Sequence, residues 1–262
     1  MMRIASWNVN SMKARLGHVI DYCKAGHTDV ILAQELKMTD ENFPYEAFQD
    51  IGWNVAVHGQ KTYNGVAILS PHEIEDVQKG LPRLVPEDEE DEQSRFIQAK
   101  IKGLHVASLY LPNGNPCPGP KFDYKLRWMN RLNHLAQDLF QSEVPILLGG
   151  DYNIIPQAID CYDENEWQGD ALYHPESRSR FFQLCHMGYV DAFRACHPNG
   201  AHYSFWDYQR GAWQKNNGIR IDHLMLSPEA ANLLKGAGID KGPRGLERAS
   251  DHTPVWCDLA IG

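Results

Sequence analysis

The sequence lacks the patterns that mark disulfide-rich, zinc-dependent and membrane-spanning proteins. Its six cysteines form no Cys-x-x-Cys pair, and the chain contains no His-x-x-x-His spacing or Cys/His cluster. Scattered cysteines in a long chain indicate a reducing, intracellular compartment, and the missing ligand spacing argues against a zinc enzyme. No apolar segment approaches the length needed to span a bilayer, and the first residues lack the charged and apolar regions of a signal peptide. We therefore expect a cytoplasmic protein without a membrane partner.

A basic charge balance, which is typical of proteins that bind nucleic acid, is also missing. The formal net charge is -9, whereas binding to phosphates normally requires a basic surface. Six of the negative charges lie in one run from Glu87 to Glu92, and without this run the net charge would be -3. The run is predicted to be a solvated loop that points away from any DNA. The charge balance therefore does not exclude a nucleic-acid partner.

No linker divides the chain. Its 262 residues with 43% hydrophobic content can bury a large core, and strand-like runs extend from Ile4 to Val255. We therefore expect a single domain over residues 1–262 that both ends of the chain help to close.

Apolar or alternating runs of strand length alternate with a smaller number of helical patterns. The predicted strands are Arg3 to Asn8, Asp29 to Gln34, Asn54 to Val57, Gly65 to Leu69, Phe96 to Ile101, His105 to Leu111, Val144 to Gly149, Ile219 to Leu226 and Thr253 to Leu259. Helices are predicted at Ala14 to Ala25, Asp123 to Gln141, Ser177 to Met187 and Pro228 to Leu234. Strands with similar polar endings, early and past the middle, indicate two similar sheets packed face to face.

Short polar motifs follow several of these apolar runs. They are Ser6 to Asn10, Gln34-Glu35, Gly150 to Asn153, Arg220 to His223 and Ser250 to His252. Buried strands that end in Asn, Asp, Glu and His would deliver hard oxygen ligands and one imidazole to a shared sheet edge. Together the motifs predict one metal-dependent phosphoryl site.

Glu35 and Asp151 are the main carboxylate candidates. Each follows a buried apolar run, where a carboxylate either meets a cation or bears the cost of desolvation. Asp151 and Asn153 lie on the same side of an extended chain, so the first could act as base or ligand and the second as its positioner. A structural Asx-turn explains this tripeptide equally well, and Asn8 taken alone is best explained as a residue that caps a turn.

The pair Asp251-His252 gives the most specific pattern. An imidazole in a site needs a partner on its second nitrogen to hold its tautomer and orientation. Asp222, from a neighbouring strand, could be that partner for His252. Most other histidines, including His18, His58, His134 and His223, are predicted to be surface or packing residues.

Taken in order, the motifs make the chain resemble the exonuclease III-type apurinic/apyrimidinic endonucleases of the endonuclease/exonuclease/phosphatase superfamily. The resemblance covers essentially the whole chain and also includes His58 to Lys61, Tyr110 to Gly114 and Phe205 to Tyr208. Seven or more motifs in order are specific, although each one alone is weak. The resemblance implies a four-layer α/β sandwich, in which two packed mixed β-sheets are flanked by helices.

The resemblance also implies a function and a set of roles. The expected activity is Mg2+- or Mn2+-dependent hydrolysis in duplex DNA by a monomer, either 5' to abasic sites or at 3' ends as an exonuclease or 3'-phosphatase. Glu35 would be the main metal ligand, with Asn8, Asn10 and Asp251 near the metal. Asp151 would activate water or protonate the leaving oxygen, with Asn153 orienting it. The expected phosphate contacts are His252, held by Asp222, and Tyr110.

Substrate-binding residues carry over from the same resemblance. Phe205, Trp206 and Ile219 would line an apolar pocket for a flipped-out sugar that lacks its base, although without the resemblance Phe205 and Trp206 would be read as core. Lys215 and Arg220 are the favoured DNA contacts, whereas the basic residues Lys121, Lys125, Arg127 and Arg131 could simply be solvated. The loop from Cys161 to Pro175 does not indicate which activity dominates.

Two rival hypotheses remain open. A phosphodiesterase or phosphatase that acts on RNA or a small phosphoester would keep the same acid, amide and imidazole set without a sugar pocket. A catalytically silent DNA-binding protein or scaffold is disfavoured, because that set is intact.

Overall fold

Two mixed β-sheets pack face to face in the computed structural model, which describes residues 1–85 and 91–262. Sheet A has the strand order β11-β12-β1-β2-β4-β3, and sheet B has the order β5-β6-β7-β8-β10-β9. The strands of sheet A are β1 (Met2–Asn8), β2 (Val30–Gln34), β3 (Asn54–His58), β4 (Val66–Ser70), β11 (Leu234–Ile239) and β12 (Val255–Leu259). Those of sheet B are β5 (Glu75–Lys79), β6 (Phe96–Ile101), β7 (Leu104–Tyr110), β8 (Ile146–Asp151), β9 (Val190–Asp191) and β10 (Asp222–Leu226).

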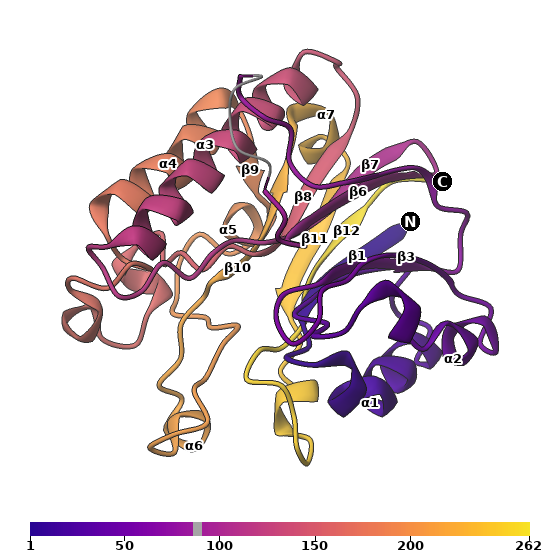
Figure 1. The fold of residues 1–262 in the computed structure, drawn as a ribbon, viewed down its shortest axis with the longest axis horizontal. Helices are drawn as coiled ribbons and strands as arrows, with labels where there is room; N and C mark the ends of the chain where they lie inside the picture. Colours follow the sequence, from indigo (N-terminus) through magenta and orange to yellow (C-terminus); the bar gives the residue numbers. More distant parts are fainter. Residues whose placement is uncertain (86–90) are drawn as a thin grey trace.

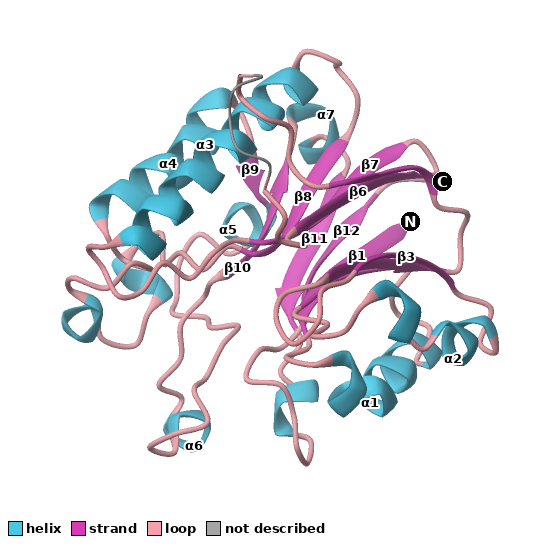
Figure 2. Ribbon diagram, in the orientation of Figure 1, coloured by secondary structure: helices cyan, strands magenta, loops and turns pink. Residues whose placement is uncertain are grey.

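Helices cover the outer face of each sheet (Figures 1 and 2). The elements are α1 (Met12–Lys24), α2 (Tyr45–Gln49), α3 (Pro120–Phe140), α4 (Pro175–Met187), α5 (Ala192–Cys196), α6 (Ala212–Lys215) and α7 (Pro228–Ala231). Helices α1 and α2 lie beside sheet A, and α3 and α4 lie beside sheet B. Among the described residues, no helix combines the length and apolar character that crossing a membrane requires.

Three hydrophobic clusters hold the layers together. One lies between the sheets and includes Ile4, Leu32, Val106 and Leu224. A second joins sheet B to α3 and α4, and a third joins sheet A to α1 and α2. Burial on both faces explains why the central strands are continuous apolar runs rather than alternating ones. The predicted four-layer α/β sandwich is confirmed.

Each sheet contains a parallel pair of strands near its centre, and both pairs end at polar motifs. Strand β1 runs parallel to β2 with Asn8 opposite Gln34, and β7 runs parallel to β8 with Tyr110 opposite Asp151. Strand β10 joins β8 in antiparallel fashion, which places Asp222 opposite Asp151. Because the sheets face each other, these ends form one polar region.

The longer predicted helices are present but begin slightly earlier than the periodicity indicates. Ser11 caps α1 by accepting a hydrogen bond from the Ala14 amide, and prolines stand in the first turns of α3 and α4. A proline suits the start of a helix because it has no N–H to leave unpaired there. The helix predicted over Pro228 to Leu234 is shorter, since β11 begins at Leu234.

The predicted strand Ile219 to Leu226 begins later, at Asp222. Ile219 instead makes isolated bridges to Cys161 and Phe205. Ile219 therefore lies outside sheet B and lines the pocket of the candidate site.

Strands β5, β9 and β11 are not predicted by the sequence patterns. All five residues of β5 are exposed, and β9 has two residues, so neither carries an apolar signal. Strand β11 contains Gly238, where a Cβ would lie 2.5 Å from the Trp256 ring. The glycine allows close packing and at the same time hides the strand from propensity rules.

The acidic run Glu87 to Glu92 falls partly outside the described residues, which resume at Asp91. Glu92 is exposed, as predicted, but Asp91 is half-buried and accepts a hydrogen bond of 2.8 Å from the Tyr124 hydroxyl. Asp91 is therefore attached to α3, which corrects the prediction of a wholly solvated loop at this residue.

Candidate active site

Asn8 links the carboxylates that end β2 and β8. Its Nδ2 donates to Glu35 Oε1 and to Asp151 Oδ2, both at 2.9 Å, while its Oδ1 accepts from the Asn10 amide at 3.0 Å. Asn8 is fully buried and Asp151 is 1% exposed. In this orientation Asn8 holds the two carboxylates in register rather than offering its own oxygen to a ligand.

The backbone around these side chains adopts the left-handed region, which is uncommon for residues other than glycine. The φ angles are 44° for Asn10, 53° for Glu35, 55° for Lys37 and 48° for Asn153. Hydrogen bonds from the Ser11 amide to the Glu35 carbonyl and from the Lys37 amide to the Asn64 carbonyl fix the segment. Such conformations persist where surrounding structure enforces them, and they concentrate at functional sites.

His252 is held by Asp222, as the sequence predicts. Its Nδ1 lies 2.9 Å from Asp222 Oδ2, and Ser204 Oγ donates to the same oxygen at 2.6 Å. Burial alone would lower the pKa of His252, but the charges of Asp222 and Asp151 outweigh burial and raise the pKa to about 10. His252 is therefore an imidazolium at neutral pH, with Nε2 3.7 Å from Asp151 Oδ2.

Asp151 is a buried carboxylate whose partners offset only part of the cost of burial. Burial raises its pKa to about 7, against the lowering effect of His252 and of the hydrogen bonds from Asn8 and the Asn153 amide. The Asn153 backbone N–H donates to Asp151 Oδ1 at 2.9 Å and forms the predicted Asx-turn, whereas the Asn153 side chain donates to the Leu111 carbonyl at 2.9 Å. The preceding Gly150 permits close contact between β7 and β8, because a Cβ there would lie 1.9 Å from the Leu109 carbonyl oxygen.

The oxygen atoms around Glu35 fit a hard divalent cation. Burial favours the neutral form of Glu35, but hydrogen bonding from Asn8 and the charge of Lys37 prevail and lower its pKa. Glu35, Asp151 and His252 bring ligand atoms within 4.8 Å of one another and could hold a metal ion. An imidazolium has no lone pair for a metal, so we assign the cation to Glu35 together with the neighbouring Asn10 and Asp251, which are joined by a 3.0 Å hydrogen bond.

Tyr110 and Arg95 border the same region. Burial and the nearby charges of Glu35 and Asp151 raise the pKa of Tyr110 well above its ordinary value. The Arg95 guanidinium lies 4.8 Å from the Tyr110 ring centroid. Tyr110 therefore stays a neutral hydroxyl, which forms a hydrogen bond with Glu35.

Lys125 is buried behind the site, which corrects the expectation that the lysines of α3 are solvated. Its Nζ donates to the carbonyls of Asn153 at 2.6 Å and Asn113 at 3.0 Å, and burial lowers its pKa to about 7. Lys125 therefore ties the loop after β7 to the turn that carries Asn153.

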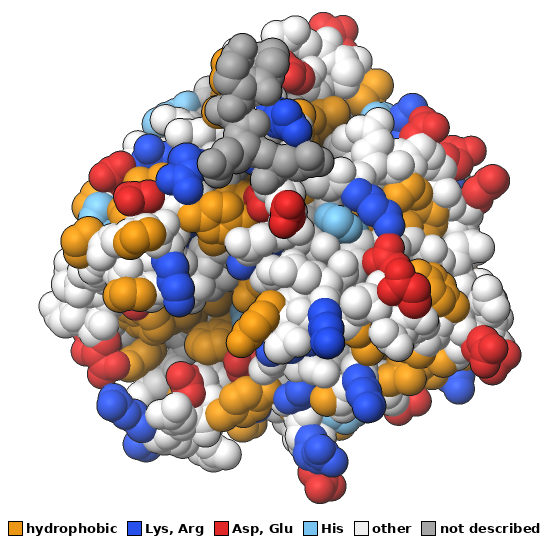
Figure 3. Space-filling view, viewed as in Figure 1, with side chains coloured by type: hydrophobic (Ala, Val, Ile, Leu, Met, Phe, Trp, Pro, Cys, Tyr) orange, Lys and Arg blue, Asp and Glu red, His pale blue; other side chains and the backbone are white. Residues whose placement is uncertain are grey.

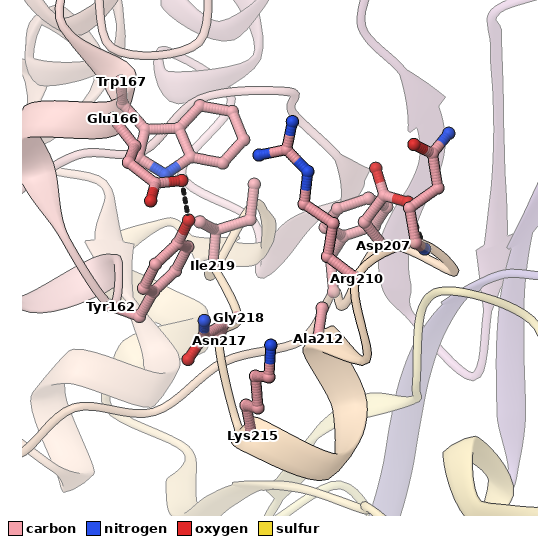
Figure 4. A pocket seen from close by; sticks show the side chains of 12 residues that line it. Tyr162, Glu166, Trp167, Asp207, Arg210, Ala212, Lys215, Asn217, Gly218 and Ile219 are labelled. Carbon is pink, nitrogen blue, oxygen red and sulfur yellow. Dashed lines mark hydrogen bonds between the residues drawn. The ribbon is translucent and has the colours of Figure 1, made fainter.

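A pocket of about 470 Å³ adjoins His252. The Phe205 ring lies 4.9 Å from the His252 ring, and Phe205 and Ile219 both line the pocket. Lys215 lines the rim, and Arg210 points its guanidinium toward the side that Trp167 lines (Figure 4). Tyr162 donates a hydrogen bond to Glu166 at that side.

Trp206 and Arg220 lie behind this pocket rather than in it. Trp206 is fully buried and its Nε1 donates to Asn216 Oδ1 at 3.2 Å. Arg220 is 1% exposed and is paired with Asp160 at 2.7 Å and Asp191 at 2.8 Å. The guanidinium is thus committed to two carboxylates and is not presented to DNA, contrary to the expectation for Arg220. His223, predicted to be a packing residue, joins this network through Arg220.

Sequence reasoning missed several of these residues, and only some left a signal. Lys125 falls on the apolar stripe of α3, three residues after Phe122 and four before Met129, which could have revealed its burial. Asp160, Glu166 and Trp167 come from the loop after β8, where no pattern distinguishes them.

Comparisons with known proteins agree with this geometry. The chain matches the Endonuclease/Exonuclease/phosphatase family over residues 5–252. It is 34% identical over 270 residues to exodeoxyribonuclease III of Haemophilus influenzae, which covers 98% of this chain and 100% of that protein. The solved structure of the 3' phosphatase NExo from Neisseria bound to a product DNA hairpin has 39% identity and a TM-score of 0.94, and 99% of each chain is covered. An AP endonuclease from Archaeoglobus fulgidus has 34% identity and a TM-score of 0.93, with 100% of each chain covered.

Proposed function

The chain belongs to the endonuclease/exonuclease/phosphatase family, and we propose that it is a DNA-repair nuclease that hydrolyses phosphate esters in duplex DNA. The observation that carries this proposal is the set formed by the half-buried Glu35 and the buried residues Asn8, Asp151, Asp222 and His252. It combines a base, a cationic acid and an oxygen site for a divalent ion within one region. The full-length similarity to exodeoxyribonuclease III supports DNA as the substrate.

The proposed chemistry divides between two side chains. Asp151, with its raised pKa, takes a proton from the attacking water as a general base. His252, charged and held by Asp222, donates a hydrogen bond to a phosphoryl oxygen as negative charge builds there. The Asn153 amide keeps Asp151 in place, and Tyr110 provides a further neutral donor.

A metal ion completes the set. When bound, Mg2+ or Mn2+ supplies Lewis-acid stabilisation of the phosphoryl oxygens and orients the phosphate. Glu35, Asn10 and Asp251 would hold it, because all three offer hard oxygen atoms.

The proposed substrates are abasic sites, incised on the 5' side, and 3' ends, processed by exonuclease or 3'-phosphatase action. The pocket beside His252 supports both, since it offers the ring of Phe205 next to Lys215 and Arg210. The similarity to a 3' phosphatase and to an AP endonuclease points the same way.

The surface charge is compatible with DNA despite the net charge of -9. Figure 3 shows several Lys and Arg side chains near the lower middle of the visible face, where acidic side chains are fewer. We further propose that the protein acts as a monomer in the cytoplasm, because one chain carries the whole residue set and all six cysteines are free.

The proposal is tested with labelled duplexes that carry either one abasic-site analogue or a 3'-phosphate. Cleavage is measured with Mg2+ and with EDTA, beside a small phosphoester as competing substrate. Mg2+-dependent incision or 3' processing of the duplexes would support the proposal. Turnover of the small phosphoester alone would overturn it.

Replacing Asp222 by Asn is expected to lower kcat on the preferred duplex about 100-fold with little change in KM. The amide removes the charge that keeps His252 protonated and can present the wrong hydrogen-bonding group to Nδ1. Steady-state kinetics measure the effect, and Asp240→Asn serves as control. An equal rise in KM with unchanged kcat would contradict this role.

A further inference from the structure

The ammonium group of Lys37 lies between two oxygen atoms that suit a divalent cation. Its Nζ is 2.9 Å from Glu35 Oε2 and donates to Asn10 Oδ1 at 2.5 Å. Carboxylate and amide oxygens are the ligands that Mg2+ and Mn2+ prefer. A resident positive charge therefore already uses two atoms of the site assigned to the metal.

The remaining polar atoms of these side chains are occupied by other partners. Glu35 Oε1 accepts from Asn8, and the Asn10 amide group donates to Asp251 Oδ1 at 3.0 Å. Glu35 Oε2 and Asn10 Oδ1 are thus the atoms on which an incoming cation would compete with Lys37. Glu35 Oε1 keeps a second lone pair, but Asn10 Nδ2 is a donor and cannot bind a metal, so Asn10 can serve a cation only through the oxygen that Lys37 occupies.

The backbone is fixed, so the lysine stem is the part free to move. Leu36 is fully buried between Glu35 and Lys37, and its amide donates to the Gly65 carbonyl at 3.1 Å. A Cβ on Gly65 would lie 2.9 Å from Leu36 Cβ, so this contact is tight. The Lys37 side chain, in contrast, is 30% exposed, and its four-carbon stem can carry the ammonium into solvent.

We propose that Lys37 is a built-in competitor of the divalent cation and sets the metal affinity of the site. Two cations a few ångströms apart repel each other, and the repulsion is strong where water screens poorly. Metal binding therefore has to displace the Lys37 ammonium from Glu35 Oε2 and Asn10 Oδ1. The inference rests on the metal site of the proposed function but not on DNA cleavage.

The test measures Mn2+ binding to the full chain without DNA, by electron paramagnetic resonance of free Mn2+. Lys37→Met keeps the length of the side chain and removes its charge, and it is expected to lower the Kd for Mn2+ about tenfold. Lys37→Arg keeps the charge and should bind Mn2+ like the wild type. Lys13→Met, which removes a charge from an exposed position of α1, is the matched control and should change the Kd little.

Thermal unfolding gives a second readout that requires no activity. Added Mn2+ should raise the Tm of Lys37→Met more than that of the wild type, because stabilisation by a ligand grows as its Kd falls. Adding Glu35→Gln to the wild type or to Lys37→Met should abolish the rise in Tm that Mn2+ produces.

Unchanged or weaker Mn2+ binding by Lys37→Met would overturn the proposal, because a lysine that merely positions Glu35 would help the metal. Failure of every variant to bind Mn2+ would overturn it as well. If the wild type binds Mn2+ through Glu35 but cleaves no duplex, the proposed function fails while the role of Lys37 stands.

Discussion

Replacing Asp151 by Asn is expected to reduce the rate of duplex hydrolysis by about 10⁴-fold while leaving DNA binding intact. The amide has nearly the same shape, but its single oxygen can accept only one of the two hydrogen bonds that reach Asp151, which come from Asn8 Nδ2 to Oδ2 and from the Asn153 backbone N–H to Oδ1. It cannot take a proton from water, and general-base catalysis typically contributes about 10²–10⁴-fold. Single-turnover cleavage and a DNA-binding titration with Mg2+ separate the two effects.

The same substitution should stabilise the fold. Burial raises the pKa of Asp151, so at pH 8 the folded protein holds a carboxylate whose ionised form is disfavoured. We expect the Tm in EDTA to rise by about 2–4 °C, which is the shift that 1 kcal/mol gives in a domain of this size. Asp138→Asn, at an exposed position of α3, is the control and should change neither rate nor Tm. Retention of more than a tenth of the wild-type rate would exclude Asp151 as the base.

Replacing Arg220 by Met is expected to lower the free energy of unfolding by about 3–5 kcal/mol. The variant keeps the volume of the side chain but leaves Asp160 and Asp191 buried without their cation. Arg194 still contacts Asp160 at 2.5 Å, so Asp191 bears most of the loss. Urea unfolding monitored by tryptophan fluorescence gives the value. Arg180→Met, which removes a pair with the exposed carboxylate of Glu176, should cost less than about 1 kcal/mol.

The loss should depend on pH with a defined sign. Burial would raise the pKa of Asp191, but Arg220 and His223 outweigh it and lower the pKa below its ordinary value. Such a group contributes stability that is present above the unfolded pKa of about 4 and is lost as pH falls through the folded pKa. The difference in the free energy of unfolding between the wild type and Arg220→Met should therefore be largest at pH 7 and should become smaller in strong acid. A gap that widened in acid would contradict the ion-pair explanation.

The layers of the fold can be predicted from the sequence because burial dictates them directly. Strands such as β2 and β8 are buried on both faces, and this leaves apolar runs such as Val30 to Ala33 in β2. Edge strand β5 has no buried residue, so its position follows from pairing with β6 and leaves no local pattern. Strand β11 is missed for a different reason. Its glycines make room for the Trp256 ring, and glycine has a low propensity for strands.

Some residues of the candidate site can likewise be predicted from local sequence, and others cannot. Glu35, Asp151 and His252 are predictable because each lies at or close to the end of a strand, where a polar residue stands out against apolar neighbours. Arg220 also stands out as a polar residue among apolar neighbours, but it forms a buried ion pair. A sequence does not distinguish a buried cation from one that contacts phosphate. Its partners Asp160 and Asp191 are 60 and 29 residues away, and no local pattern reports contacts over such separations. Three-dimensional structure is what distinguishes a structural ion network from a DNA contact.

Strand β12 pairs with β1, joining Met2 to Leu259 in the middle of sheet A. This pairing has a consequence for limited proteolysis. A cut that released the segment from Asp251 to Leu259 would remove His252 from Glu35 and Asp151, and it would also leave β1 with an unpaired edge. The residue set of the candidate site therefore depends on the contact between two strands that lie far apart in the sequence.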